Sequence, residues 1–152
     1  MKQYIVTAAS FLLLFSFACN SGDKESPKSE NDIDAARNFI RSALDGKFNE
    51  AKTFLFSDSS NIEYFDANQR NYQRINPDEK RSLREASINI HKVNPVNDST
   101  TIVIYSNSYK NNIDTLKVLK KNSQWLVDLK YLFEHDNDTL NSSGSNKKDT
   151  LK

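Results

Sequence analysis

Apolar residues recur at helical spacing through the first part of this 152-residue chain, after its N-terminal thirty residues. Ile33, Ala36 and Ile40 lie on one side of a predicted helix that runs from residue 32 to about residue 45. Gly46 follows at the point where a left-handed residue would end that helix. A second, short helix is expected from about residue 47, where Phe48, Ala51, Phe54 and Leu55 follow one another.

Polar residues mark the starts of the predicted helices. Asn31 or Asp32 can cap the first helix, and Asp58 can cap a third. Asn76 comes directly before Pro77, which suits the first turn of a fourth helix that ends near residue 85.

After this helical region the apolar period changes to two, which is typical of strands. The sequence predicts strands at residues 88–91, 101–109, 113–121 and 124–133. Their connectors are short turn sequences, and short connectors join antiparallel neighbours. Helices followed by such a meander predict an α+β fold, with N-terminal helices packed on a curved antiparallel sheet of about four strands.

The N-terminal segment has the pattern of an export signal. Lys2 precedes an apolar run over residues 4–18, which is shorter than the roughly 20 apolar residues of a membrane-spanning helix. Residues 16–19, Ser-Phe-Ala-Cys, resemble a lipobox, the processing site of bacterial lipoproteins, although Ser16 stands where that site commonly has Leu. The resemblance implies a signal peptide at residues 1–18 and a diacylglyceryl group on Cys19. The expected location is the bacterial cell envelope, in the outer membrane with a periplasmic or surface face. The alternative is an ordinary secreted protein.

Polar segments flank the region of periodic sequence. Residues 19–31 read as a flexible tether and residues 134–152 as a disordered tail, which leaves 32–133 as the folded domain. The tail carries two Asp-Thr-Leu triplets. They resemble the O-glycosylation acceptor of exported proteins in some bacteria, with Thr139 and Thr150 as the sites. Chance in an Asp- and Thr-rich chain is the alternative.

Charge and cysteine content exclude several classes of function. The chain has 21 basic and 20 acidic residues and no concentrated basic run, so nucleic-acid binding is not expected. A single cysteine permits no intramolecular disulfide and no CxxC metal motif, and His91 and His135 lie far apart. With three scattered glycines there is no phosphate-binding loop. We therefore expect no metal and no cofactor.

The order of elements resembles the lumazine-binding-like domains found in bacterial lipoproteins, within the nuclear-transport-factor-2-like (NTF2-like) superfamily. The residues that carry the resemblance are 35–51, 114–119 and 125–129, and it covers about 32–133. The resemblance implies a cone-shaped fold with a pocket between the sheet and the helices. That superfamily includes isomerases, dehydratases and domains without catalysis, so the fold alone does not give the function.

Several side chains are candidates for a site in such a pocket. Phe39, Phe65, Tyr72 and Trp125 could line it, although packing in the core is the alternative for each. The candidate acids and bases are Asp114, Asp128, His91, Tyr64, Tyr72, Tyr105 and Tyr109. Strand alternation places Asp128 opposite Trp125, so Asp128 is expected to point to solvent or to a partner.

The leading functional hypothesis is a membrane-anchored, non-catalytic domain that binds an envelope protein or a small ligand. It depends on the anchor and on the missing catalytic constellation. The rival is a small pocket enzyme of the isomerase or hydrolase-like kind, which requires an ionisable group inside the cone.

Overall fold

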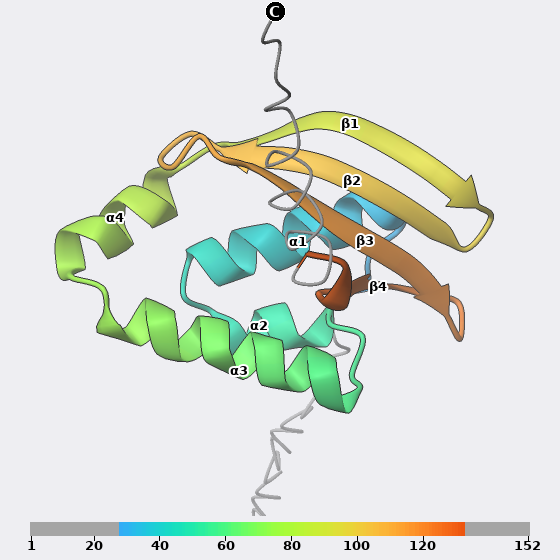
Figure 1. Ribbon diagram of the computed structural model, residues 1–152, viewed down its shortest axis with the longest axis horizontal. Coiled ribbons are helices and arrows are strands. Elements are labelled where there is room, and N and C mark those ends of the chain that lie inside the picture. The colour runs from blue at the N-terminus through green and yellow to red at the C-terminus, as the bar shows by residue number, and fades with distance from the viewer. Residues whose placement is uncertain (1–27, 133–152) are drawn as a thin grey trace, which may run out of the picture.

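A computed structural model describes residues 28–132 (Figure 1). Helices precede strands along the chain, as the sequence predicted. The helices are α1 (Asp32–Leu44), α2 (Phe48–Thr53), α3 (Ser59–Arg74) and α4 (Pro77–Glu85). The strands are β1 (Ile88–Asn97), β2 (Thr100–Asn107), β3 (Ile113–Lys121) and β4 (Gln124–Asp128).

Side-chain caps begin three of the helices where the sequence predicted them. The Asn31 side chain accepts a hydrogen bond from the N–H of Asp34 at 2.9 Å, and Asp58 accepts one from Asn61 at 2.9 Å. Asn76 accepts from the N–H of Glu79 at 2.8 Å, with Pro77 in the first turn of α4. These contacts span three residues, so local sequence is enough to specify them.

Gly46 ends the first helical segment in the left-handed conformation that was predicted, with φ of +75°. A second constraint comes from the tertiary structure. A Cβ at this position would lie 2.6 Å from Cε1 of Tyr72, whose ring crosses the turn from α3. Both backbone conformation and close packing therefore require glycine here.

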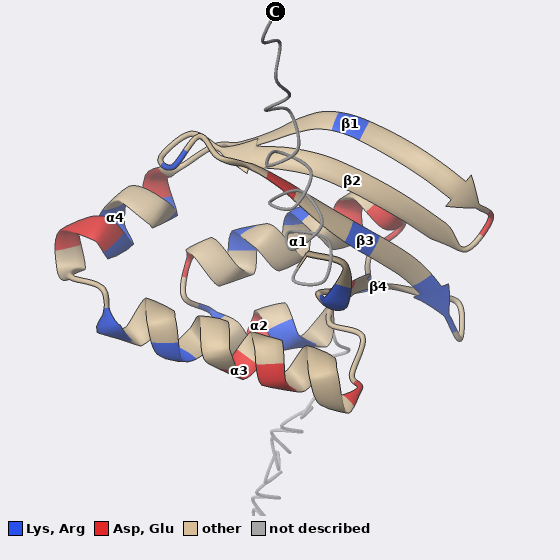
Figure 2. Cartoon of the chain, in the orientation of Figure 1, with Lys and Arg blue, Asp and Glu red and all other residues tan. Residues whose placement is uncertain are grey.

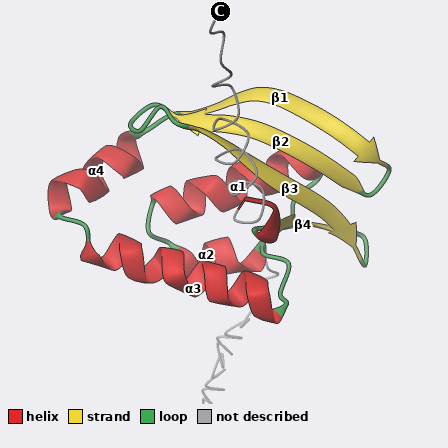
Figure 3. Cartoon of the chain, in the orientation of Figure 1, coloured by secondary structure: helices red, strands yellow, loops and turns green. Residues whose placement is uncertain are grey.

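The four strands form one antiparallel sheet in the order β1-β2-β3-β4 (Figure 3). The sheet curves over α1, which contacts every strand (Figure 1). A bulge between Ile90 and Lys92 shifts the register of β1 against β2. The predicted α+β fold, with helices on one face of a curved four-stranded antiparallel sheet, is confirmed.

The second strand ends at Asn107, two residues before the predicted end, and two other strand boundaries differ by more. β1 continues through Pro95 to Asn97, where a turn was expected. Proline is tolerated there because β1 is an edge strand, and Pro95 faces no further strand on its outer side. β4 ends at Asp128, and a helical turn begins at Lys130 in place of a strand to residue 133.

The core lies between α1 and the concave face of the sheet. Ala35 and Ala36 are fully buried, and their small side chains let α1 lie close to the strands. The other buried apolar residues of this cluster are Phe39, Ile40, Phe48, Ala51, Phe54, Leu55, Phe65, Val103, Leu116, Val118, Val127 and Leu129. Within the part of the chain that the structure describes, all of them fall between residues 35 and 129.

The outer edge of β4 is closed by the segment after α2. The N–H of Val127 donates to the carbonyl of Phe54, and the N–H of Phe56 donates to the carbonyl of Val127, both at 2.8 Å. Leu55 thereby forms a parallel bridge with Val127. This contact protects an edge that would otherwise expose unpaired backbone groups.

Several sequence predictions fall outside the described residues. They concern the leader 1–18, Cys19 and most of the tether, and also the tail with Thr139 and Thr150. Between residues 28 and 132, no helix has the length and apolar character needed to cross a bilayer.

Candidate functional site

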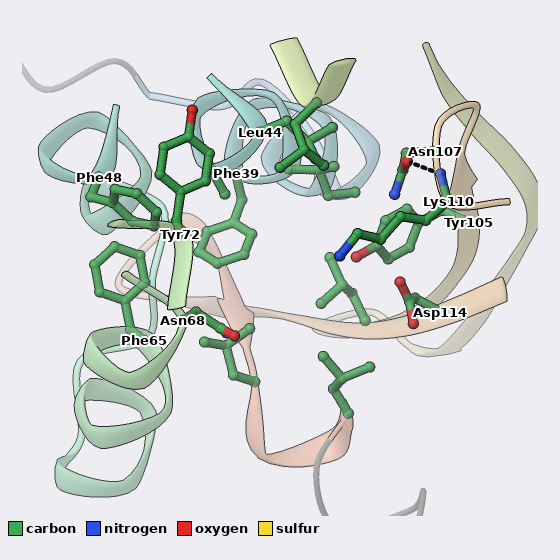
Figure 4. A pocket seen from close by; sticks show the side chains of 16 residues that line it. Phe39, Leu44, Phe48, Phe65, Asn68, Tyr72, Tyr105, Asn107, Lys110 and Asp114 are labelled. Carbon is green, nitrogen blue, oxygen red and sulfur yellow. Dashed lines mark hydrogen bonds between the residues drawn. The ribbon is translucent and has the colours of Figure 1, made fainter. Parts of the chain in front are cut away.

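A cavity of about 280 Å³ opens between the helices and one end of the sheet (Figure 4). Its walls come from all four helices, from β2, β3 and the hairpin that joins them, and from the residues after β4. Apolar side chains form most of the lining, and polar groups gather toward β2 and β3.

The apolar wall is a set of aromatic rings in mutual contact. Phe48 is central, because its ring centre lies 5.7 Å from that of Phe65 and 5.3 Å from that of Tyr72. Both contacts are edge-to-face, and Phe39 adds a tilted contact to Phe65 at 6.2 Å. Edge-to-face pairs are a favourable arrangement for aromatic rings, so these side chains stabilise one another in the wall.

The polar end of the cavity is built by strand pairing. Tyr105 on β2 lies directly opposite Asp114 on β3. Figure 4 shows the Tyr105 hydroxyl, the Lys110 ammonium and the Asp114 carboxylate on the same side of the cavity. The Lys110 ammonium also lies 3.9 Å from the carboxylate of Glu79 on α4.

Asn107 orders the hairpin that carries Lys110. Its side-chain oxygen accepts the backbone N–H of Lys110 at 2.9 Å and that of Tyr109 at 3.2 Å. The amide nitrogen of Asn107 is turned toward the cavity (Figure 4). The same side chain therefore holds the hairpin in shape and offers a hydrogen-bond donor to the site.

Tyr105 keeps its proton over the whole physiological range. Burial raises the pKa of the Tyr105 phenol well above its ordinary value of 10.0, and the nearby charge of Asp114 raises that pKa further. Both effects disfavour the phenolate. The hydroxyl consequently acts as a neutral hydrogen-bond donor at this end of the cavity.

Three of the four aromatic residues proposed from the sequence line this cavity, namely Phe39, Phe65 and Tyr72. Trp125 does not line it. It is half-buried at the opposite end of the sheet, packs against the core, and has the Lys120 ammonium 5.4 Å from its ring centre. The structure therefore separates Trp125 from the group to which the sequence assigned it.

The expectation that Asp128 points to solvent or to a partner is wrong, since Asp128 is only 3% exposed. Asn61 donates to one carboxylate oxygen at 3.1 Å, and the ammonium of Lys117 lies 3.5 Å from the other. Asp128 does lie on the face opposite Trp125, but the start of α3 covers it there. Alternation along a strand cannot reveal a helix that packs over its end.

The remaining acid/base candidates are distributed over the molecule. Asp114 and Tyr105 line the cavity, together with Tyr72. His91 is on the exposed side of β1, where Nε2 lies 2.8 Å from the hydroxyl of Ser106. Tyr109 is 42% exposed and Tyr64 packs against the core, and neither lines the cavity.

Sequence reasoning missed Asn107, Lys110 and Asn68 as lining residues. Lys110 appeared to be only the first residue of a turn, and nothing local distinguishes it from other surface lysines. The one available signal was the Asn-Ser-Tyr-Lys stretch at the end of a predicted strand, because polar residues at a strand end can line a pocket at that end of the sheet.

Among the described residues, no group of three or more His, Cys, Asp or Glu side chains is arranged to hold a metal ion. Comparison with known proteins adds one likeness. The chain is similar to the crystal structure of an NTF-2 like protein of unknown function from Shewanella oneidensis MR-1, with a TM-score of 0.47 and 14% sequence identity. The match covers 62% of this chain and 89% of the other. No protein-family model and no curated protein matches the sequence.

Proposed function

We propose that this protein is a lipid-anchored, non-catalytic binding domain of the bacterial envelope, with the cavity beside Tyr105 as its ligand site. The order of helices and meander, with a pocket between them, supports a cone of the NTF2-like kind and a lumazine-binding-like domain within it. The observation that carries the binding role is a wall of mutually packed aromatic rings and a polar end in one cavity.

The cavity favours a small amphipathic ligand. Its volume of about 280 Å³ lies just below the usual range for ligand pockets, so a molecule of one or two rings fits better than a large cofactor. Aromatic rings would cover the apolar part of the ligand. Lys110, Tyr105 and Asn107 supply donors and Asp114 supplies an acceptor, so the ligand needs a polar group with both donor and acceptor character.

Native mass spectrometry of protein released from its own membranes tests this binding role. We expect wild-type protein to carry a small bound molecule, and Tyr105→Phe and Lys110→Met to lower its occupancy. Tyr109→Phe is the matched control, because Tyr109 lies on the same hairpin but does not line the cavity. Protein that is always empty, or equal occupancy in all variants, would contradict the proposal.

The rival function, a small pocket enzyme such as an isomerase or hydrolase-like protein, has one specific observation in its favour. Tyr105 and Asp114 lie opposite each other in the cavity, and a phenol beside a carboxylate can stabilise an oxyanion and move a proton. Proton NMR of the recovered ligand incubated with fresh protein separates the two. An unchanged ligand supports binding, whereas a new product that Asp114→Asn abolishes supports the enzyme.

The anchor is proposed on sequence grounds, from the apolar run that ends in the single cysteine of the chain. Two or more acyl chains would hold the domain stably at a membrane, because each buried methylene contributes about 0.8 kcal/mol. Cells fed radioactive palmitate should label the wild-type protein and not Cys19→Ser. Protein found free in the aqueous fraction without acyl mass would contradict the anchor.

A further inference from the structure

A second hollow, of about 620 Å³, lies at the end of the sheet away from the ligand cavity. The end of α2, the segment after it and the β3–β4 hairpin form its sides. Its lining includes Lys28, Lys52 and Lys121 and contains no carboxylate. Figure 2 shows basic segments at the end of α2 and at the tip of β3, beside this hollow, which we call the lysine groove.

The three lysines of the groove take part in none of the ion pairs found among the described residues. The ion pairs of the described residues engage other lysines, namely Lys47, Lys110, Lys117 and Lys130. The Lys121 ammonium lies 4.7 Å from the ring centre of Phe56, which holds it at the wall of the groove. Ser57 and Gln124 add polar side chains to the same lining.

The groove also lies where the chain leaves toward the proposed anchor. Lys28 lines the groove, and it is only nine positions after Cys19 in the sequence. Nine residues span at most about 30 Å even when fully extended. A lipid on Cys19 would therefore hold this end of the domain near the headgroups, where lysines within a Debye length of about 8 Å feel the surface charge.

We infer that the lysine groove is the face that the domain lays on a bilayer containing anionic phospholipid. Phosphate oxygens would accept hydrogen bonds from its ammonium groups, from the Ser57 hydroxyl and from the Gln124 amide. The attraction is local, because basic and acidic residues nearly balance over the whole chain. The inference relies on the proposed anchor for the position of the membrane.

This orientation has a consequence for the ligand cavity. Asp114 at the start of β3 lines the cavity, whereas Lys121 at the end of β3 lines the groove. The two sites are thus separated by the length of a strand. With the groove on the membrane, the polar end of the cavity lies away from the lipid.

Vesicle sedimentation tests the groove without the anchor, using the chain from residue 20 to 152, which retains every residue that the structure describes. At low salt, this chain should bind vesicles of phosphatidylcholine with one third phosphatidylglycerol more tightly than pure phosphatidylcholine vesicles. Each lysine near an anionic surface contributes roughly fivefold, so three give roughly a hundredfold difference. High salt should remove it.

The triple variant Lys28→Gln, Lys52→Gln, Lys121→Gln should lose this preference for anionic vesicles. The matched control is Lys47→Gln, Lys80→Gln, Arg84→Gln, which removes the same charge from a different hollow near Gly46 and should retain it. Circular dichroism establishes that both variants are folded.

Equal binding to the two kinds of vesicle, or equal loss in both triple variants, would overturn the inference. Binding to soluble polyaspartate but not to anionic vesicles would also overturn it, in favour of an acidic protein partner. Because these tests use no lipid on Cys19, they can fail while palmitate labelling still supports the anchor, and the reverse also holds.

Discussion

Replacing Asn61 with alanine should destabilise the domain more than Tyr105→Phe, Lys110→Met or Tyr109→Phe does. Asn61 is fully buried, and its side chain joins two elements far apart in sequence. Its oxygen accepts the backbone N–H of Leu129 at 2.6 Å, and its nitrogen donates to Asp128 at 3.1 Å. Alanine removes both hydrogen bonds and has no atom that can replace either.

The magnitude follows from what alanine leaves behind. A buried N–H without a partner costs about 1–3 kcal/mol, and a hydrogen bond to a charged group contributes about 1.5–3 kcal/mol. The two effects together give a loss of about 2.5–6 kcal/mol in the free energy of unfolding. For a domain of this size, that loss lowers the melting temperature by roughly 10 °C or more.

Urea unfolding of the chain from residue 20, followed by circular dichroism, measures the loss. Asn71→Ala is the control, because Asn71 is an exposed asparagine on the same helix and its replacement should change stability by about 0.5 kcal/mol or less. If Asn61→Ala costs less than about 1 kcal/mol, the link between α3 and the end of β4 is not a major source of stability and the reasoning fails.

Three further substitutions test other contacts by the same unfolding assay. Gly46→Ala should cost at least about 1–2 kcal/mol, since a left-handed alanine is strained and its Cβ would also contact Tyr72; an unchanged midpoint would show that the turn relaxes freely. Asp58→Asn tests a pH effect, because the hydrogen bond from Lys130, followed by that from the N–H of Asn61, lowers the Asp58 pKa below 3.8. A lowered pKa stabilises the fold above pH 3.8, so the wild type should have a higher free energy of unfolding than the variant at pH 7. This difference should disappear as the pH falls through the pKa of Asp58 in the folded state. A difference in the free energy of unfolding that persists in acid contradicts the prediction. Arg41→Met should cost about 2 kcal/mol, because Arg41 donates to the carbonyls of Ala86 at 2.7 Å and Leu83 at 3.1 Å; a loss no greater than that of the exposed Arg37→Met would refute the role.

Those three residues also differ in how far the sequence alone revealed them. The helix cap at Asp58 and the left-handed turn at Gly46 were predicted, because each depends on residues within three or four positions. Periodicity by itself places Arg41 on the outward side of its helix, away from Ala36 and Ile40. In the fold it reaches 42 to 45 residues along the chain to close the end of α4, and no local pattern contains that contact.

The residues of the candidate site were likewise predictable from the sequence only in part. The aromatic residues Phe39, Phe65 and Tyr72 were recognisable as a set, because large apolar side chains at helical spacing must be buried together. Their assignment to a cavity wall needed the packing of α1 against α3. Trp125 belonged to the same set by residue type, and only the position of β4 at the far end of the sheet removed it.

Local sequence therefore determined the elements of this protein, their order and the α+β class. The reason is that hydrophobic period, caps and turns act between near neighbours in the chain. Tertiary structure alone decided that Tyr105 meets Asp114, that Asp128 is buried under Asn61, and that Lys28, Lys52 and Lys121 share a groove. Those contacts join residues that are 9 to 93 positions apart, and strand register and helix packing, which set them, depend on the whole core.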